Sequence, residues 1–265
     1  MTVNMDGIDM DRNIRDRLYI ATVCAEHKEI IEKYDVGVEL DQFCDPRAID
    51  GETAEDARVE ITELLEAADR CVLHAPFSEL FPAAIDPKAR ALAMERMQQA
   101  AELAREYGTK KMIVHSGYVP LVFFKEWHED RSVEFWEEFM ADRDDGLIIT
   151  VENVMDDEPY MMVKMMERIT NPNIRLCFDV GHAACISDVH VLEWLESMAP
   201  YLGHIHIHNN DGTHDWHKPI FDGKVDMETF LDKVIELCAP DTTITIESLE
   251  GLSSMEWLNE KGYLG

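Results

Sequence analysis

The feature that most constrains the fold of this chain is a regular alternation of short apolar segments with longer amphipathic ones. Eight segments rich in apolar and β-branched residues recur, at residues 17–23, 36–43, 71–77, 111–117, 147–153, 174–181, 204–210 and 242–248. Between them lie stretches such as 87–108, 158–170 and 227–238, in which apolar residues are three and four positions apart. Near-continuous apolar strands are typical of a sheet buried on both faces, and the intervening spacing is typical of helices packed on that sheet.

Eight strands alternating with helices predict a single (β/α)8 barrel. The length of 265 residues is common for one such barrel, and no linker rich in Gly, Pro or Ser divides the chain. A doubly wound open sheet is the rival architecture, but no glycine-rich phosphate loop follows the first predicted strand. We therefore expect one domain over residues 1–265. The polar, acidic residues 1–16 are interpreted as a flexible arm.

The charge and cysteine content limit the partners and the compartment. The chain has 24 Lys and Arg against 54 Asp and Glu, which gives a net charge of -30 at pH 7. So acidic a surface repels phosphate backbones, and no nucleic acid is expected as a partner. The six cysteines include no CxxC pair, no signal-peptide pattern begins the sequence, and no apolar run has the length of a membrane span. We expect a cytoplasmic protein with reduced thiols and no membrane partner.

Six of the predicted strands end in a residue that can bind a metal ion. These residues are His74, His115, Glu152, Asp179, His208 and Glu247. In a parallel barrel all strands point the same way, so that residues at their carboxyl ends gather at one mouth. Adjacent strands are about 4.8 Å apart, which lets several ends approach one ion. One buried carboxylate is costly, but three beside imidazoles make sense around a cation that offsets their charge, and the sequence therefore predicts a metal site.

The segment HIHIHNNDGTHDWH, residues 204–217, holds five of the eleven histidines. Side chains alternate along a strand, so His204, His206 and His208 share one face. We expect only His208, at the strand end, to reach the metal site, with His206 in a supporting layer and His204 deeper in the core. His214 is expected to be exposed. His217 is either a metal ligand or part of the pocket wall.

The motifs HAPF, VHSG, VEN, FDVGHA, HIHNND, DWHKP and TIE resemble those of the xylose-isomerase-like barrel superfamily, from about Leu18 to the end. This superfamily includes ketose 3-epimerases, hydroxypyruvate isomerases, inosose dehydratases and zinc-dependent apurinic endonucleases. The resemblance implies a divalent metal held by Glu152, Asp179, His208 and Glu247. Three carboxylates and one imidazole suit Mn²⁺, Mg²⁺ or Co²⁺, and also Zn²⁺.

The first function that this resemblance implies is isomerisation or epimerisation of a small sugar or related polyhydroxy carbonyl. The metal would polarise the carbonyl and stabilise an enediolate. Glu152 and Glu247 would transfer the proton, and His182 would bind a substrate oxygen. His74 and His115 would line the substrate pocket. Dehydration or lyase cleavage on the same metal site is an alternative, because it shares the enediolate.

The second function is phosphoester hydrolysis by a multi-zinc site of the apurinic endonuclease type. Nine positions of that zinc cluster have counterparts here: His74, His115, Glu152, Asp179, His182, His208, Asp215, His217 and Glu247. The net charge of -30 opposes DNA binding. VHSG also lacks the second histidine of the endonuclease motif, and the segment from His208 to Asp215 is short and lacks its lysine. The sugar function is therefore favoured.

Three further expectations concern the surroundings of the site. No arginine closely follows His208, which favours an unphosphorylated substrate. Isomerase-like members of the superfamily usually have a G-x-G turn after the motif that matches His217-Lys218-Pro219, and here Phe221 stands at its first glycine, so that it either narrows the pocket or reshapes the loop. Glu39, near the end of the second predicted strand, is expected to face the pocket. The resemblance also leaves a homodimer open.

Overall fold

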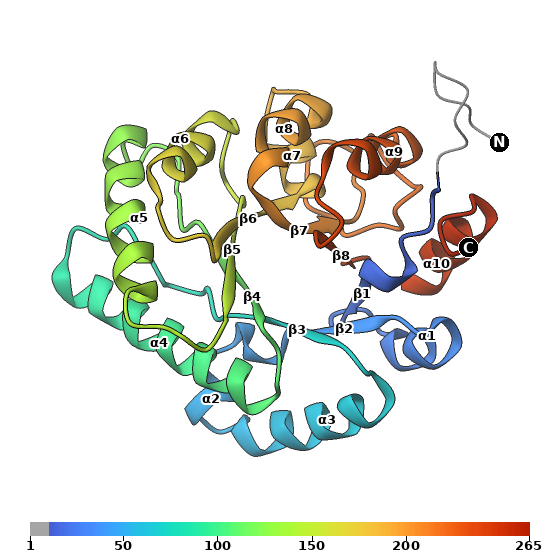
Figure 1. The fold of residues 1–265 in the computed structure, drawn as a ribbon, viewed down its shortest axis with the longest axis horizontal. Coiled ribbons are helices and arrows are strands. Elements are labelled where there is room, and N and C mark those ends of the chain that lie inside the picture. Colours follow the sequence, from blue (N-terminus) through green and yellow to red (C-terminus); the bar gives the residue numbers. More distant parts are fainter. Residues whose placement is uncertain (1–10) are drawn as a thin grey trace.

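The computed structural model describes residues 11–265 as a closed barrel of eight parallel strands surrounded by helices (Figure 1). The strands are β1 (Leu18–Ala21), β2 (Gly37–Leu40), β3 (Cys71–His74), β4 (Lys111–His115), β5 (Ile148–Glu152), β6 (Ile174–Asp179), β7 (Leu202–Ile207) and β8 (Thr243–Ile246). They pair in sequence order, and β8 closes the barrel on β1. The predicted (β/α)8 barrel is confirmed.

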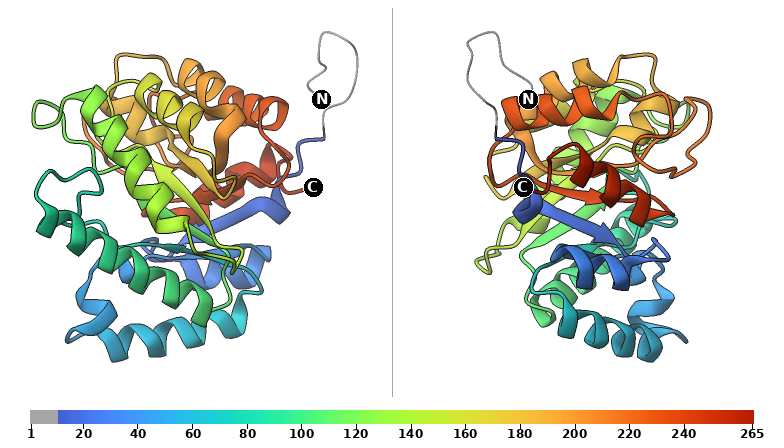
Figure 2. Two further views of the ribbon diagram at one scale, coloured as in Figure 1. Left: turned by 60° about the vertical axis from the view of Figure 1, so that its left-hand side comes forward. Right: turned by 90° about the vertical axis from the view of Figure 1, so that its right-hand side faces the viewer.

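An outer ring of helices covers the barrel, as the two side views of Figure 2 show. The helices are α1 (His27–Tyr34), α2 (Arg47–Asp50), α3 (Ala54–Ala67), α4 (Pro87–Glu106), α5 (Lys125–Met140), α6 (Tyr160–Arg168), α7 (Val180–Ile186), α8 (Val191–Met198), α9 (Met227–Leu237) and α10 (Gly251–Glu260). Short 3-10 helices are η1 (Arg15–Arg17), η2 (Gln42–Cys44) and η3 (Ala199–Tyr201). Among the described helices, none is long and apolar enough to cross a membrane.

The helices form and pack as their sequences predict. Helix α4 begins with Pro87, whose fixed φ suits a first helical position, and the Asp86 carboxylate accepts a hydrogen bond from the backbone N–H of Lys88 at 2.7 Å. The methionines of α6 and Trp136 of α5 are buried against the barrel, as their helical spacing indicates.

The first described residues are not a flexible arm. The side chain of Ile14 is buried, and its backbone N–H donates to the carbonyl of Tyr263 at 2.9 Å. The Arg12 guanidinium lies over the Tyr263 ring and pairs with Glu228 at 3.1 Å. The prediction was wrong for residues 11–16, because their apolar and cationic side chains find partners at the other end of the chain. Residues 1–10 lie outside the described part.

The barrel interior contains a column of polar side chains. At the end of the barrel opposite the mouth, the Lys111 ammonium donates to the carbonyl of Gly203 and to the Thr243 hydroxyl, both at 2.7 Å. Thr243 Oγ1 lies 2.6 Å from Nδ1 of His204, and Nε2 of His204 lies 3.2 Å from Oε2 of Glu39. Burial lowers the pKa of Lys111 to about 8. The contacts from Lys111 through Thr243 and His204 to Glu39 thus form a continuous polar chain along the barrel axis towards the mouth.

Candidate active site

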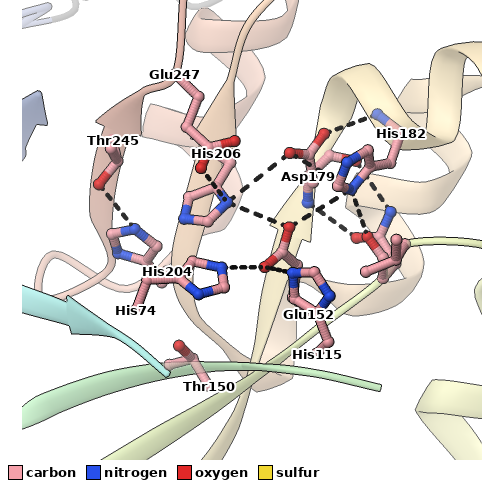
Figure 3. A network of polar contacts seen from close by, with 12 residues as sticks. His74, His115, Thr150, Glu152, Asp179, His182, His204, His206, Thr245 and Glu247 are labelled. Atoms are coloured by element: carbon pink, nitrogen blue, oxygen red, sulfur yellow. Dashed lines mark hydrogen bonds and ion pairs between the residues drawn. The ribbon is translucent and has the colours of Figure 1, made fainter. Parts of the chain in front are cut away.

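Carboxylates from three strands converge at the mouth of the barrel (Figure 3). Glu152 ends β5, Asp179 ends β6 and Glu247 directly follows β8. Nδ1 of His206, in β7, lies 3.3 Å from Oε1 of Glu152, 3.5 Å from Oε1 of Glu247 and 3.8 Å from Oδ2 of Asp179. All four side chains are buried. Three of the four residues predicted to bind a metal are thus brought to one place, which we call the carboxylate cluster.

His208, the fourth predicted ligand, joins this cluster through Asp179. Its Nε2 lies 3.1 and 3.2 Å from the two Asp179 oxygens, and its buried Nδ1 has no hydrogen-bond partner within residues 11–265. The ring stacks on that of His217 at a centroid distance of 4.0 Å. It also passes directly over Gly181, where an added Cβ would lie 1.9 Å from His208 Cε1. Only glycine at position 181 leaves room for this imidazole.

His74 and His115 lie on the other side of Glu152. Their Nε2 atoms are 3.2 and 3.6 Å from Oε2 of Glu152, respectively. The ring of Phe77 stacks on His115 at a centroid distance of 4.1 Å and an interplanar angle of 10°. Both histidines therefore stand beside the carboxylate cluster, as their strand-end positions predict.

His182, Asp215 and His217 complete the polar surroundings. The backbone N–H of His182 donates to Oδ1 of Asp179 at 2.7 Å, because Asp179 caps helix α7. The His182 ring lies 3.4 Å from Glu152 Oε1 through Nδ1 and 3.2 Å from Asp215 Oδ2 through Nε2. His217 contacts the same Asp215 oxygen at 3.0 Å and has a left-handed φ of 46°. The loop backbone is thus strained where it presents His217 to the site.

The electrostatic environment shifts the pKa values of these carboxylates in opposite directions. Burial and the charges of Asp179 and Glu152 raise the pKa of Glu247 to about 8, against the opposing effect of His206. Burial disfavours the charged form of Asp179 as well, but His182 and His208 lower its pKa to about 2. Burial lowers the pKa of His115 to about 3. The excess negative charge around Glu247 is what a bound cation would offset.

The donor set fits a divalent metal ion. Side-chain ligand atoms lie within 4.8 Å of one another in several groups, among them Glu152 with Asp179 and His182, and Glu152 with His74 and His115. Another group is His182, His208, Asp215 and His217. Carboxylate oxygens and imidazole nitrogens are ligands of Mn²⁺, Co²⁺ and Zn²⁺, and carboxylates also suit Mg²⁺.

Beside the cluster lies a cavity of about 620 Å³, a volume typical of small-molecule sites. It is lined by Thr22, Val23, Asp41, Gln42, Cys44, Glu60, His74, Phe77, His115, Glu152, Val154, His182, Asp215, His217 and Glu247. Glu39 points inward as expected, but it lies below this cavity, between His204 and His206. Phe221 is exposed, and His214 is exposed as predicted.

Sequence reasoning missed two features of this site. His206 was expected only to support the metal ligands, yet its Nδ1 faces the three carboxylates directly. Asp41 and Gln42 were not singled out, although both line the cavity. The available signal was their place at the end of the second predicted strand, where barrels put binding residues.

Comparisons with known proteins agree with this architecture. Residues 33–261 match the model of the family described as xylose isomerase-like TIM barrel. The uncharacterized protein MJ1311 of Methanocaldococcus jannaschii is 30% identical over 217 residues, which cover 76% of this chain and 74% of that protein.

Two solved structures share the fold over nearly their whole lengths. One is a D-tagatose 3-epimerase-like protein, with 24% identity, a TM-score of 0.74 and coverage of 92% of this chain and 96% of that one. The other is the TTHB071 protein from Thermus thermophilus, soaked with ZnCl2, with 22% identity, a TM-score of 0.75 and coverage of 93% and 97%. The closed eight-stranded barrel and the family match together show that this chain belongs to the xylose isomerase-like TIM barrel family.

Proposed function

We propose that the protein is a divalent-metal-dependent isomerase or epimerase of a small sugar or a related polyhydroxy carbonyl. The observation that carries the proposal is the convergence of Glu152, Asp179 and Glu247 on one point beside the cavity. Family membership and the likeness to a D-tagatose 3-epimerase-like protein support the sugar class.

In this proposal Glu152, Asp179, His208 and Glu247 hold the metal. A bound divalent cation would polarise the substrate carbonyl and offset the negative charge that develops when a neighbouring C–H proton leaves. Glu152 and Glu247 reach the cluster from β5 and β8, which bring them to His206 from different sides (Figure 3). In this proposal one of them takes a proton from a substrate carbon and the other returns a proton on the opposite side.

The remaining histidines would bind the substrate. His182 lines the cavity between Glu152 and Asp215, where its imidazole could hold a substrate oxygen. His74 and His115 line the cavity next to Glu152 and would position the sugar against that carboxylate.

Deuterium incorporation tests this proposal. Aldoses and ketoses are incubated in D2O with protein loaded with Mn²⁺, and NMR is used to detect deuterium on the carbon beside the carbonyl. We expect incorporation in at least one sugar, because a proton held by a carboxylate at an open cavity exchanges with solvent. Removal of the metal with EDTA should abolish exchange. His182→Ala should slow it while metal remains bound, and the exposed control His214→Ala should leave it unchanged.

A second candidate function, hydrolysis of phosphoesters by several zinc ions, is favoured by one observation. His182, His208, Asp215 and His217 form another group able to hold a metal, adjacent to the carboxylate cluster. This function would be supported if the protein bound two or three zinc ions per chain, cleaved abasic DNA and showed no deuterium exchange. One ion per chain and exchange into a sugar would decide against it. Release of water or carbon–carbon cleavage after exchange would identify a dehydratase or lyase.

We also propose a homodimer formed through an exposed apolar surface beside the mouth. We call Ile85, Leu121, Val122 and Phe124 the apolar rim; their exposed fractions are 70%, 104%, 68% and 80%. The two loops that carry them contact each other, since the Phe81 and Phe123 ring centroids are 6.0 Å apart. Residues 116–124 include no charged side chain, although the chain has a net charge of -30. An uncharged apolar surface of this kind lets two acidic molecules come into contact without placing like charges against each other.

Sedimentation equilibrium tests the dimer. Leu121→Asp combined with Phe124→Asp should shift the protein to monomer, because it places charge in the contact. The control, Val59→Asp with Leu92→Asp, alters apolar residues of α3 and α4 that are 53% and 44% exposed, and should leave the dimer intact. Higher salt should strengthen the wild-type dimer by screening the repulsion between the subunits. A wild-type protein that stays monomeric at high salt contradicts the proposal.

A further inference from the structure

One aromatic ring lines the cavity and takes no part in the proposed proton transfer. Phe77 lies in the loop between β3 and helix α4, three residues after His74, and its side chain is 37% exposed. Single exposed apolar side chains are common on protein surfaces, so exposure alone decides nothing. The place of this ring is what matters. Among the described residues that line the cavity, Phe77 is the only phenylalanine, tyrosine or tryptophan.

The loop holds the Phe77 backbone on both sides. Before it, the Ala75 backbone N–H donates to the carbonyl of Ile113 in β4 at 2.9 Å. After it, the Leu80 backbone N–H donates to the carbonyl of Phe77 itself at 3.1 Å, and Glu79 in this turn has a left-handed φ of 57°. The start of the Phe77 side chain is therefore constrained by the end of the sheet and by a closed turn.

Two histidines then fix the plane of the ring. Phe77 stacks on His115 at a centroid distance of 4.1 Å and an interplanar angle of 10°, and it meets His74 at 5.7 Å and 75°. Both histidines lie beside Glu152, whose Oε2 is 3.6 Å from Nε2 of His115 and 3.2 Å from Nε2 of His74 (Figure 3). Since His115 covers one face of the ring, its exposed part belongs to the other face and the outer edge. This free surface is held in a fixed relation to Glu152.

A free aromatic face of this kind binds C–H groups. The π-electrons give the face of the ring a partial negative charge, whereas C–H hydrogens carry a partial positive charge. A sugar has C–H groups on its faces and hydroxyl groups around its edge. Within residues 11–265, Val23 and Val154 are the other cavity-lining side chains that consist of carbon and hydrogen alone. A bound sugar can thus turn its hydroxyls to the polar side chains and lay its C–H groups on Phe77.

We infer that Phe77 binds the substrate by stacking its free face on C–H groups of the sugar, and that it thereby positions the reacting carbon against Glu152. The inference rests on the proposed function for the class of ligand and for the role of Glu152. It requires a substrate with neighbouring C–H groups on one face next to the carbonyl, and with no charged group on those carbons. Phe77 is then a residue that contacts the substrate directly without taking part in proton transfer.

Selective saturation transfer tests the contact. The intact protein is made with deuterium on carbon everywhere except in phenylalanine, and it is loaded with Mg²⁺, which is diamagnetic and keeps NMR lines sharp. The phenylalanine ring protons are irradiated in the presence of D-fructose, D-tagatose or D-glucose. We expect the C–H protons of at least one sugar to gain saturation, and Phe77→Leu should abolish the effect. The control Phe221→Leu should preserve it, because Phe221 is 47% exposed and does not line the cavity.

Affinities show whether the ring itself is responsible. Phe77→Leu should raise the dissociation constant of that sugar about tenfold, whereas Phe77→Tyr keeps the ring and should stay within about twofold of wild type. The Mg²⁺ affinity from isothermal titration should be unchanged in both variants, because Phe77 has no ligand atom. A parallel loss of metal affinity would mean that Phe77 only holds His115 against Glu152. Equal losses in both variants would mean that the ring face is not what binds. Either result would overturn the inference.

Deuterium exchange, measured on the same variants, separates this inference from the proposed function. Saturation transfer that Phe77→Leu removes, with no exchange into any sugar, would support the inference and contradict the function. Exchange with equal dissociation constants in wild type and Phe77→Leu would support the function and overturn the inference. Binding of tetramethylammonium or abasic DNA that depends on Phe77, with no sugar bound, would assign the ring to another ligand and overturn the inference. So would the absence of saturation transfer to every sugar at millimolar concentration.

Discussion

Glu152→Gln is expected to lower the affinity for divalent metal by about 100-fold or more and to abolish turnover, while the barrel remains folded. Glu152 stands at the centre of the site: Oε1 lies 3.3 Å from His206 and Oε2 lies 3.2 Å from His74. Glutamine keeps the shape and one acceptor oxygen but loses the negative charge that a cation requires. Glu247→Gln should have the same effect, because it removes a second carboxylate from the cluster. Isothermal titration with Mn²⁺ measures the affinity, and circular dichroism monitors the fold.

Two results would count against these roles. Wild-type metal affinity and turnover in both variants would show that the carboxylates converge for another reason. Loss of the folded state in both would show that their contribution is to stability. Glu63→Gln serves as the control, because this side chain of α3 is 62% exposed and its one ion pair among residues 11–265 is with Lys28 at 3.3 Å. Its metal affinity and turnover should equal those of the wild type.

The strands and most of the mouth could be predicted from the sequence, because the apolar runs have polar ends. Strands β3, β4, β5 and β6 end at the predicted residues His74, His115, Glu152 and Asp179. Apolar residues dominate these four strands, so the ionisable residue at the end of each apolar run marks the point where the chain reaches the mouth. Strands β7 and β8 end one residue before His208 and Glu247.

The depth of each residue could not be predicted, because it depends on the register between strands. Alternation places His206 and His208 on one face, but it does not say which of them is level with Asp179. The register pairs Asp179 with His206, so His206 faces the carboxylates, while His208 bends over Gly181 to reach Asp179. The stagger of a closed barrel is a property of all eight strands together. This stagger cannot be read from the sequence pattern of residues 204–210 alone.

Gln42 and the N-terminal segment were missed for other reasons. Gln42 belongs to the 3-10 helix η2, a single turn without periodic apolar residues, so its place at the end of the second predicted strand was its one sequence signal. Ile14 and Arg12 pack against residues more than 200 positions later in the chain, such as Tyr263 and Glu228. Contacts of this kind leave no trace in a local sequence window.

The column of polar side chains inside the barrel leads to the last prediction, a loss of stability in Glu39→Gln. The buried Glu39 carboxylate lies 3.2 Å from Nε2 of His204 through Oε2 and 3.1 Å from Nε2 of His206 through Oε1, and it accepts a hydrogen bond from Thr245 at 2.5 Å. Burial alone would raise the pKa of Glu39, but His206 and His204 hold it well below its usual value. We expect the variant to lose about 3–5 kcal/mol in the free energy of unfolding, because the imidazoles keep their burial and lose their anionic partner.

Urea unfolding monitored by circular dichroism measures this change, with Glu63→Gln as the exposed control that should differ from wild type by no more than about 0.5 kcal/mol. An equal unfolding free energy in Glu39→Gln would mean that neither histidine depends on a buried anion. A large loss has a consequence for the site, because the His206 ring contacts Glu39 through Nε2 and the carboxylate cluster through Nδ1. Glu39 would then have two roles. It would stabilise the barrel interior, and it would fix the His206 imidazole around which Glu152, Asp179 and Glu247 are arranged.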